Sequence, residues 1–204
     1  NAERLRNERS RILIVCEDSK SSPAYFESVC RHYRVGKIKV TGESGSSPTS
    51  VIDFAIKNCE DNNNDYDTVY CVIDRDDHKD FERAISRAKQ WVLERKKKSK
   101  LKVIASYPCF EIWIYLHFLY TSRNYPSYDD LIPDLNSILV QNGYPKYSKQ
   151  SNYPYHRFLQ KLDCAINNAD KLETEQKNNN ALNPSTHIHY LVRDLEHFSQ
   201  NKFV

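Results

Sequence analysis

Two aspartates follow a short apolar stretch of the sequence. Residues 69–73 are rich in β-branched and aromatic side chains, which is typical of a strand buried on both faces of a parallel sheet. Asp74, Arg75 and Asp76 come directly after it. In an extended backbone the two aspartates would point the same way and Arg75 the opposite way, so their carboxylates favour a divalent cation such as Mg²⁺. An acidic turn at the start of a helix explains the same residues equally well.

A second apolar stretch also ends at carboxylates. Residues 12–15 are apolar, and Glu17 and Asp18 follow them closely. The carboxyl ends of parallel strands meet at one edge of a sheet, and open α/β sheets bind their ligands at this edge. We therefore expect Glu17 to lie close to Asp74 and Asp76.

Three further side chains are candidates for the same site. Glu111 begins an expected helix and is a candidate fourth carboxylate at the rim, although stabilisation by the helix dipole is the simpler interpretation. Lys20 could offset the charge of a phosphate, and an exposed loop lysine is an equal alternative. His78 could bind phosphate or move a proton, or it could form only a local hydrogen bond at a helix start.

The sequence that must position these residues alternates between strand and helix patterns. Strands are expected at residues 11–16, 37–41, 69–73 and 101–106, and helices at 24–33, 49–60, 80–97 and 112–120. This alternation predicts an α/β domain over residues 1–120, with a mostly parallel sheet of about four strands flanked by helices. Residues 121–204 lack strand patterns and are expected to form a helical extension packed on that domain. Its expected helices span residues 128–141, 155–172 and 185–199.

Charge and cysteine content exclude several classes of protein. The 30 basic and 27 acidic residues leave a net charge of +3, so any contact with a polyanion must be local. The six cysteines form no Cys-x-x-Cys pair and are expected to be reduced core residues rather than a zinc site or a disulfide framework. No apolar stretch is long enough to cross a membrane, and residues 1–11 lack a secretory signal pattern, so we expect a cytoplasmic protein with no membrane partner.

Histidines and tyrosines of the second half give weaker indications. His187 and His189 are two positions apart, so on a helix they would face different directions and make a poor metal pair. Ser185 or Thr186 is expected to cap that helix. The tyrosines, together with basic residues such as Lys149, could grip bases and phosphates if they lined one groove, but packing is the simpler role.

Four stretches of the sequence together resemble the RloB family. They are Ile-Val-Cys-Glu-Asp-Ser-Lys-Ser-Ser-Pro-Ala-Tyr-Phe (14–26), Val-Ile-Asp-Arg-Asp-Asp-His (72–78), Tyr-Pro-Cys-Phe-Glu-Ile-Trp (107–113) and Asn-Pro-Ser-Thr (183–186). The resemblance implies a variant of the Toprim fold, the catalytic domain of topoisomerases, primases and OLD-type nucleases. It implies that Glu17 is the Toprim glutamate after the first strand and that Asp74 and Asp76 are the Asp-x-Asp pair. Asp18 stands where relatives often carry a glycine, which puts another acidic group beside the site.

The resemblance also implies an activity. Toprim enzymes carry out Mg²⁺-dependent phosphodiester chemistry, so we expect an endonuclease of RNA, such as tRNA, or of DNA, acting in prokaryotic anti-phage defence. Glu17, Asp74 and Asp76 would bind Mg²⁺ or Mn²⁺, and Glu111 and Lys20 would assist. The expected partners are the nucleic-acid substrate, an ATPase encoded nearby and a second copy of the chain. The alternative is a non-catalytic Toprim-like module that binds a partner ATPase or nucleic acid.

Overall fold

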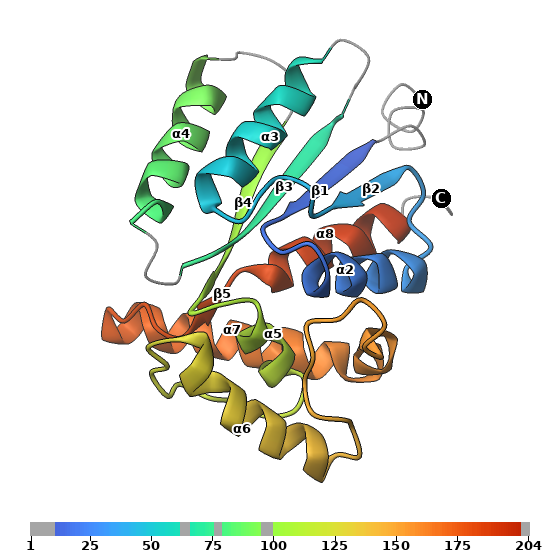
Figure 1. Cartoon of the computed structure of the whole chain (residues 1–204), viewed down its shortest axis with the longest axis vertical. Helices are drawn as coiled ribbons and strands as arrows, with labels where there is room; N and C mark the ends of the chain where they lie inside the picture. Colours follow the sequence, from blue (N-terminus) through green and yellow to red (C-terminus); the bar gives the residue numbers. More distant parts are fainter. Residues whose placement is uncertain (1–10, 62–65, 76–78, 95–99, 201–204) are drawn as a thin grey trace.

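A parallel sheet lies at the centre of the protein. The computed structural model describes residues 11–61, 66–75, 79–94 and 100–200 of the 204-residue chain. Within them, a five-stranded sheet has the order β2-β1-β3-β4-β5 (Figure 1). The strands are β1 (Ile12–Cys16), β2 (Ile38–Thr41), β3 (Thr68–Asp74), β4 (Lys100–Tyr107) and β5 (Ser185–Thr186). The first four are parallel, and β5 runs antiparallel to β4, so the predicted α/β fold with a mostly parallel sheet is confirmed.

Helices cover both faces of this sheet, which is why the middle residues of β1 and β3 are apolar and buried. One face is covered by α3 (Pro48–Glu60) and α4 (Phe81–Glu94), and the other by α2 (Ser21–His32) and α8 (Ile188–Gln200) (Figure 1). Successive residues of β1 belong to different cores. Leu13 packs in the core under α3 and α4, whereas Ile14 packs in the core under α2 and α8.

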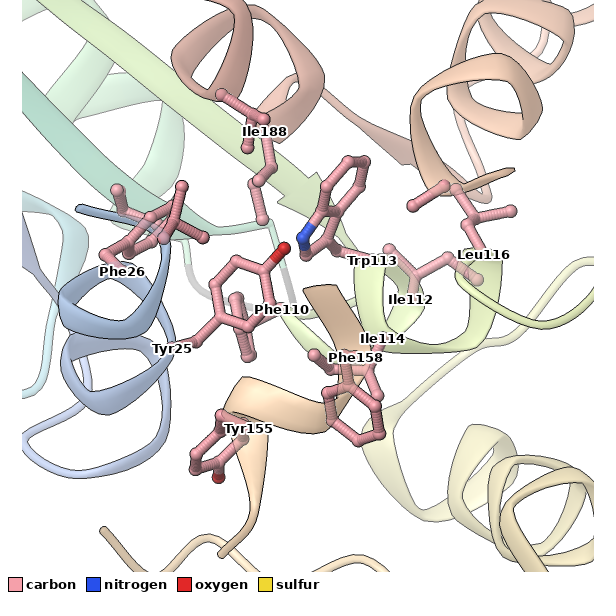
Figure 2. Close-up of a cluster of buried hydrophobic side chains, with 14 of the residues drawn as sticks. Tyr25, Phe26, Phe110, Ile112, Trp113, Ile114, Leu116, Tyr155, Phe158 and Ile188 are labelled. Carbon is pink, nitrogen blue, oxygen red and sulfur yellow. The ribbon is translucent and has the colours of Figure 1, made fainter. Parts of the chain in front are cut away.

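The core on the α2 side continues into the second half of the chain. The first half ends with α5 (Glu111–Leu116), and the second contains α6 (Tyr128–Gln141), the 3-10 helix η1 (Tyr155–Lys161) and α7 (Leu162–Asn179), followed by β5 and α8. Trp113 of α5 is fully buried in a cluster that also contains Tyr25 of α2 and Phe158 of η1 (Figure 2). The ring centroids of Tyr25 and Trp113 are 6.5 Å apart, with an interplanar angle of 86°. Residues from both halves of the chain therefore share one core.

The fifth strand is an element that the sequence did not predict. β5 contains only Ser185 and Thr186, which pair with Tyr107 and Ser106 at the end of β4. The hydroxyl groups of Ser106 and Thr186 lie 2.9 Å apart, within hydrogen-bonding distance. Thr186 also accepts a 3.3 Å hydrogen bond from the Ile188 amide, so it contributes to the start of α8 as expected for a cap.

The remaining differences concern the ends of helices. α5 ends at Leu116 instead of residue 120, and its last turn is tightened by a hydrogen bond from the His117 amide to the Ile114 carbonyl. The helix expected at 155–172 begins as η1 and continues as α7 to Asn179. α4 ends at Glu94, and the last three residues of its expected range lie outside the described residues.

Candidate active site

Glu17 and Asp74 lie next to each other at the carboxyl edge of the sheet. β1 and β3 are neighbouring parallel strands, with Cys16 opposite Val72. The two strand ends therefore meet, and the Asp74 amide donates a 2.9 Å hydrogen bond to Oε2 of Glu17. The Glu17 amide in turn donates a 3.1 Å hydrogen bond to the Val72 carbonyl. The backbone of one strand thus orients the carboxylate that follows the other.

Negative charge is concentrated around Asp74. Burial raises the pKa of its carboxyl group well above the usual range, and the charges of Glu111 and Glu17 raise this pKa further. Lys149 acts in the opposite direction, and Asp18 adds a smaller raising effect. A carboxyl group in such surroundings ionises readily only when a cation offsets the neighbouring charges.

Glu111 brings a third carboxylate to this edge from the start of α5. Only 1% of its side chain is exposed, and neither carboxylate oxygen has a hydrogen-bond partner among the described residues. A helix start favours a carboxylate through the helix dipole, as the simpler interpretation of the sequence holds. However, a buried carboxylate normally needs hydrogen bonds or a cation, because its desolvation is costly. Glu111 therefore needs positive charge beside it, which the Lys149 ammonium supplies in part and a bound metal ion would supply more fully.

Lys149 supplies a positive charge at the mouth of the site. Its ammonium lies 3.4 Å from Oε1 of Glu111 and 4.1 Å from the centre of the Tyr128 ring. Burial alone would lower the pKa of Lys149, but the charge of Glu111 and the neighbouring Cys109, Tyr128 and Asp74 outweigh this effect and raise it. The lysine is therefore held in its charged form. Sequence reasoning considered Lys149 for a nucleic-acid groove but did not connect it with the carboxylates.

Asp18 stabilises the start of α2. Its carboxylate accepts hydrogen bonds from the backbone amides of Lys20 and Ser22, at 2.9 and 3.0 Å, and from the hydroxyl group of Ser21 at 2.8 Å. These are the groups that a helix start leaves without partners. Lys20 is exposed at this turn and reaches Asp18 through its amide. Its assignment to phosphate binding stays a prediction.

Gly42 allows the end of β2 to pass tightly against the turn after Glu17. A Cβ atom at this position would lie 2.3 Å from the carbonyl oxygen of Asp18 and 2.5 Å from the Cα atom of Ser19. Both are backbone atoms, which cannot move aside without displacing the turn. The glycine thus fixes the path of the chain that carries Glu17 and Asp18.

The described carboxylates suit a hard cation, although they do not by themselves form a complete metal centre. Asp76 and His78 lie outside the described residues. Among the residues that the structure does describe, no group of three His, Cys, Asp or Glu side chains is arranged to hold a metal ion. Glu17, Asp74 and Glu111 nevertheless provide oxygen donors with excess negative charge, which is the chemistry that Mg²⁺ prefers.

The family assignment follows from a comparison over almost the whole fold. A family model described as RloB-like protein matches residues 12–195. The chain belongs to the RloB-like family. All four stretches that carry the resemblance fall within the matched residues of this RloB-like chain. Comparison with curated proteins and with solved structures gave no match. Among the described helices of the RloB-like chain, none is both long and apolar enough to span a membrane.

Most tyrosines of the RloB-like chain that were candidates for base stacking are packing residues. At most 9% of each of the following is exposed: Tyr125, Tyr144, Tyr147, Tyr153 and Tyr155. His187 and His189 are also separated. His187 is exposed, whereas His189 is fully buried with Nε2 3.4 Å from a carboxylate oxygen of Glu173.

Proposed function

We propose that this RloB-like chain is a Mg²⁺-dependent nuclease that cleaves phosphodiester bonds of nucleic acid at the carboxylate edge of its sheet. The observation that carries this proposal is the buried Glu111 carboxylate, which lacks hydrogen bonds and lies where it raises the pKa of Asp74. Packing alone does not account for carboxyl groups gathered in this way, because they repel one another when they are ionised. Their placement is explained if the site binds a divalent cation and a phosphate.

Each carboxylate has a distinct part in this proposal. By family resemblance Glu17, Asp74 and Asp76 would hold the ion, and Glu111 would assist from beside Asp74. When bound, Mg²⁺ or Mn²⁺ would supply positive charge to the scissile phosphate and to the leaving oxygen. The Asp74 amide keeps the Glu17 carboxylate directed along the sheet edge. The raised pKa of Asp74 means that its proton must leave when a cation binds.

We assign contact with the substrate phosphate to Lys149 rather than to Lys20. Its ammonium is at the mouth of the site, near Glu111, and about half of its side chain is exposed. A half-exposed ammonium can reach a non-bridging phosphate oxygen while remaining near the carboxylates. The Tyr128 ring beside it limits the directions that the lysine can take.

The test is a cleavage assay on the full chain. DNA, total RNA and tRNA are incubated separately with the protein in Mg²⁺, in Mn²⁺ and in chelator. We expect one polymer class to be cut in the metal samples and none in chelator. Asp74→Asn should abolish cleavage, because it removes a carboxylate from the site without changing its size. Asp53→Asn is the matched control. Asp53 is exposed on α3 and forms an ion pair with Arg87 of α4, so this variant should cleave at the normal rate.

Cleavage that survives Asp74→Asn, or that is equally fast in chelator, would refute the proposal of a metal-dependent nuclease at this site. A folded protein that cuts none of the polymers would favour the alternative of a non-catalytic module for a partner ATPase or nucleic acid. The Glu111–Lys149 ion pair is the observation that favours this alternative, because it partly neutralises the site without a metal. The role in anti-phage defence, the partner ATPase and the homo-oligomer rest on the family resemblance and stay predictions.

A further inference from the structure

A cavity of about 580 Å³ opens beside α4 at the end of the sheet where β4 pairs with β5. It lies between α4, the end of β4, β5 and the last turns of α7, and Arg75, Phe81, Tyr107, Lys177 and His187 are among its walls. Small-molecule sites typically span roughly 300–1,000 Å³, so this cavity is large enough for one organic ligand. Nothing in the proposed cleavage chemistry uses it.

The cavity and the carboxylates share the same edge of the sheet. Arg75 follows Asp74 directly, and its Cα atom is about 3.8 Å from that of its neighbour. The Arg75 amide donates a 2.7 Å hydrogen bond to the Ser106 carbonyl of β4, which continues the strand direction. The two side chains therefore leave the backbone on opposite faces, as predicted from the alternation of an extended chain. A ligand that crosses this edge can reach both places.

In the wall of the cavity, the guanidinium of Arg75 lies over two aromatic rings. The Arg75 guanidinium carbon lies 5.2 Å from the centre of the Phe81 ring and 5.7 Å from that of the Tyr107 ring. Rings and guanidinium planes of this kind are the groups on which proteins stack unpaired bases. Leu182 and Ile85 contribute apolar side chains to the wall of the cavity.

Opposite charges in the walls balance each other. Arg75 pairs with Glu82 at 3.1 Å, and Lys177 pairs with Glu173 at 2.7 Å. Although part of the His187 side chain is exposed, partial desolvation in the cavity wall lowers its pKa from the usual value, so this residue is neutral near neutral pH and offers both a hydrogen-bond donor and an acceptor. A balanced, largely apolar cavity suits a flat neutral ring with polar edges better than it suits a free anion.

We propose that this cavity binds an unpaired base of the nucleic-acid substrate, in the nucleotide next to the scissile phosphate. The proposal rests on the proposed nuclease function for the identity of the ligand. The phosphate then lies at the carboxylate edge, and the adjoining base turns across Arg75 into the cavity. A base held in a duplex cannot make this contact, so the substrate is single-stranded or has an unpaired base at the cleavage site.

The test measures binding in chelator, so that no cleavage is needed. The isotopically labelled full chain is titrated with adenosine, with uridine and with ribose 5-phosphate, and backbone amide signals are followed by NMR. The two nucleosides should shift the signals of β5 and of the end of α7, whereas ribose 5-phosphate should not. This comparison uses the unmodified chain and depends on no variant.

Two variants locate the binding. Ala181 lines the cavity, and Ala181→Trp should fill it and weaken nucleoside binding at least about fivefold, the loss expected for one stacking contact. Val140→Trp is the matched control, because Val140 is 54% exposed on α6, and it should bind as the unmodified chain does. Spectra of both variants also report whether they are folded.

Equal shifts with ribose 5-phosphate, shifts confined to other regions, or undiminished binding by folded Ala181→Trp would overturn the proposal. Nucleoside binding in the cavity by a protein that cuts nothing would leave the cavity assignment in place and remove the nuclease. Cleavage of a polymer without nucleoside binding would keep the proposed nuclease function and overturn the cavity assignment.

Discussion

Replacing Lys149 by methionine tests whether this lysine is the cation that stabilises the buried Glu111. The ammonium lies 3.4 Å from Oε1, and the two side chains are 48% and 1% exposed. Two unit charges at 3.4 Å attract each other by about 5 kcal/mol at an effective dielectric constant of about 20. Because the lysine is half in water and the Glu111 oxygens have no hydrogen bond, we reduce this to about 1–2 kcal/mol of net stability.

The assay is urea and thermal unfolding near neutral pH in chelator, followed by circular dichroism. Lys149→Met should lower the free energy of unfolding by about 1–2 kcal/mol, which for a chain of this size corresponds to a melting temperature lower by about 2 to 8 °C. Lys146→Met is the control, since Lys146 is exposed in the same loop, and it should change little. Methionine keeps most of the apolar length of the lysine, so packing against Tyr128 is largely retained.

A double-mutant cycle separates the ion pair from other effects of the substitution. In a Glu111→Gln background the buried charge is gone, so Lys149→Met should then cost almost nothing. An equal loss of stability in both backgrounds would show that Lys149 acts through some other contact, and no loss in either would refute the reasoning.

Two further predictions concern stability and the turn after Glu17. Burial lowers the pKa of His117 from 6.5 to about 4, so the folded state binds fewer protons than the unfolded state between these values, and stability should fall as the pH falls from 6.5 to 4, by about 3 kcal/mol in total. Urea unfolding across this range should show the decline, and it should be much smaller in His117→Gln. Gly42→Ala would place a Cβ atom against the backbone of Asp18 and should cost roughly 1–3 kcal/mol, with reduced cleavage, because the turn carrying Glu17 must move. Thermal unfolding and the cleavage assay check this, and an unchanged variant would mean that the turn is not held as tightly as the structure has it.

Much of the first half of the fold could be predicted because its strands and helices follow from patterns among residues that are close in the sequence. Strands covered on both faces have continuous apolar sequences, and helices between them have an apolar stripe, so the order of elements could be predicted from residues 12–106. The closeness of Glu17 and Asp74 follows from one further rule, that neighbouring parallel strands end at the same edge.

The parts that could not be predicted depend on contacts between distant segments. Lys149 lies in a polar loop between α6 and η1, and no periodicity or spacing connects it with Glu111. Asp18 looked like an additional acidic group of the site, and only the hydrogen bonds it accepts identify it as the residue that holds the start of α2. β5 consists of two polar residues, so its sequence shows no strand pattern. It forms by pairing with the edge of β4, which is a contact between segments far apart in the sequence.

The shared core of the two halves has a consequence for the protein during its synthesis. The strands of the carboxylate edge are translated early, but α8, which covers one face of their sheet, and the loop that carries Lys149 are translated late. Asp194 of α8 joins β3 to β4 through Tyr70 and Lys102, so the sheet is braced by the last helix that the structure describes. On the ribosome, the strands that end in Glu17 and Asp74 therefore emerge well before the loop of Lys149 and the helix that braces their sheet, so the carboxylate edge is completed late in synthesis.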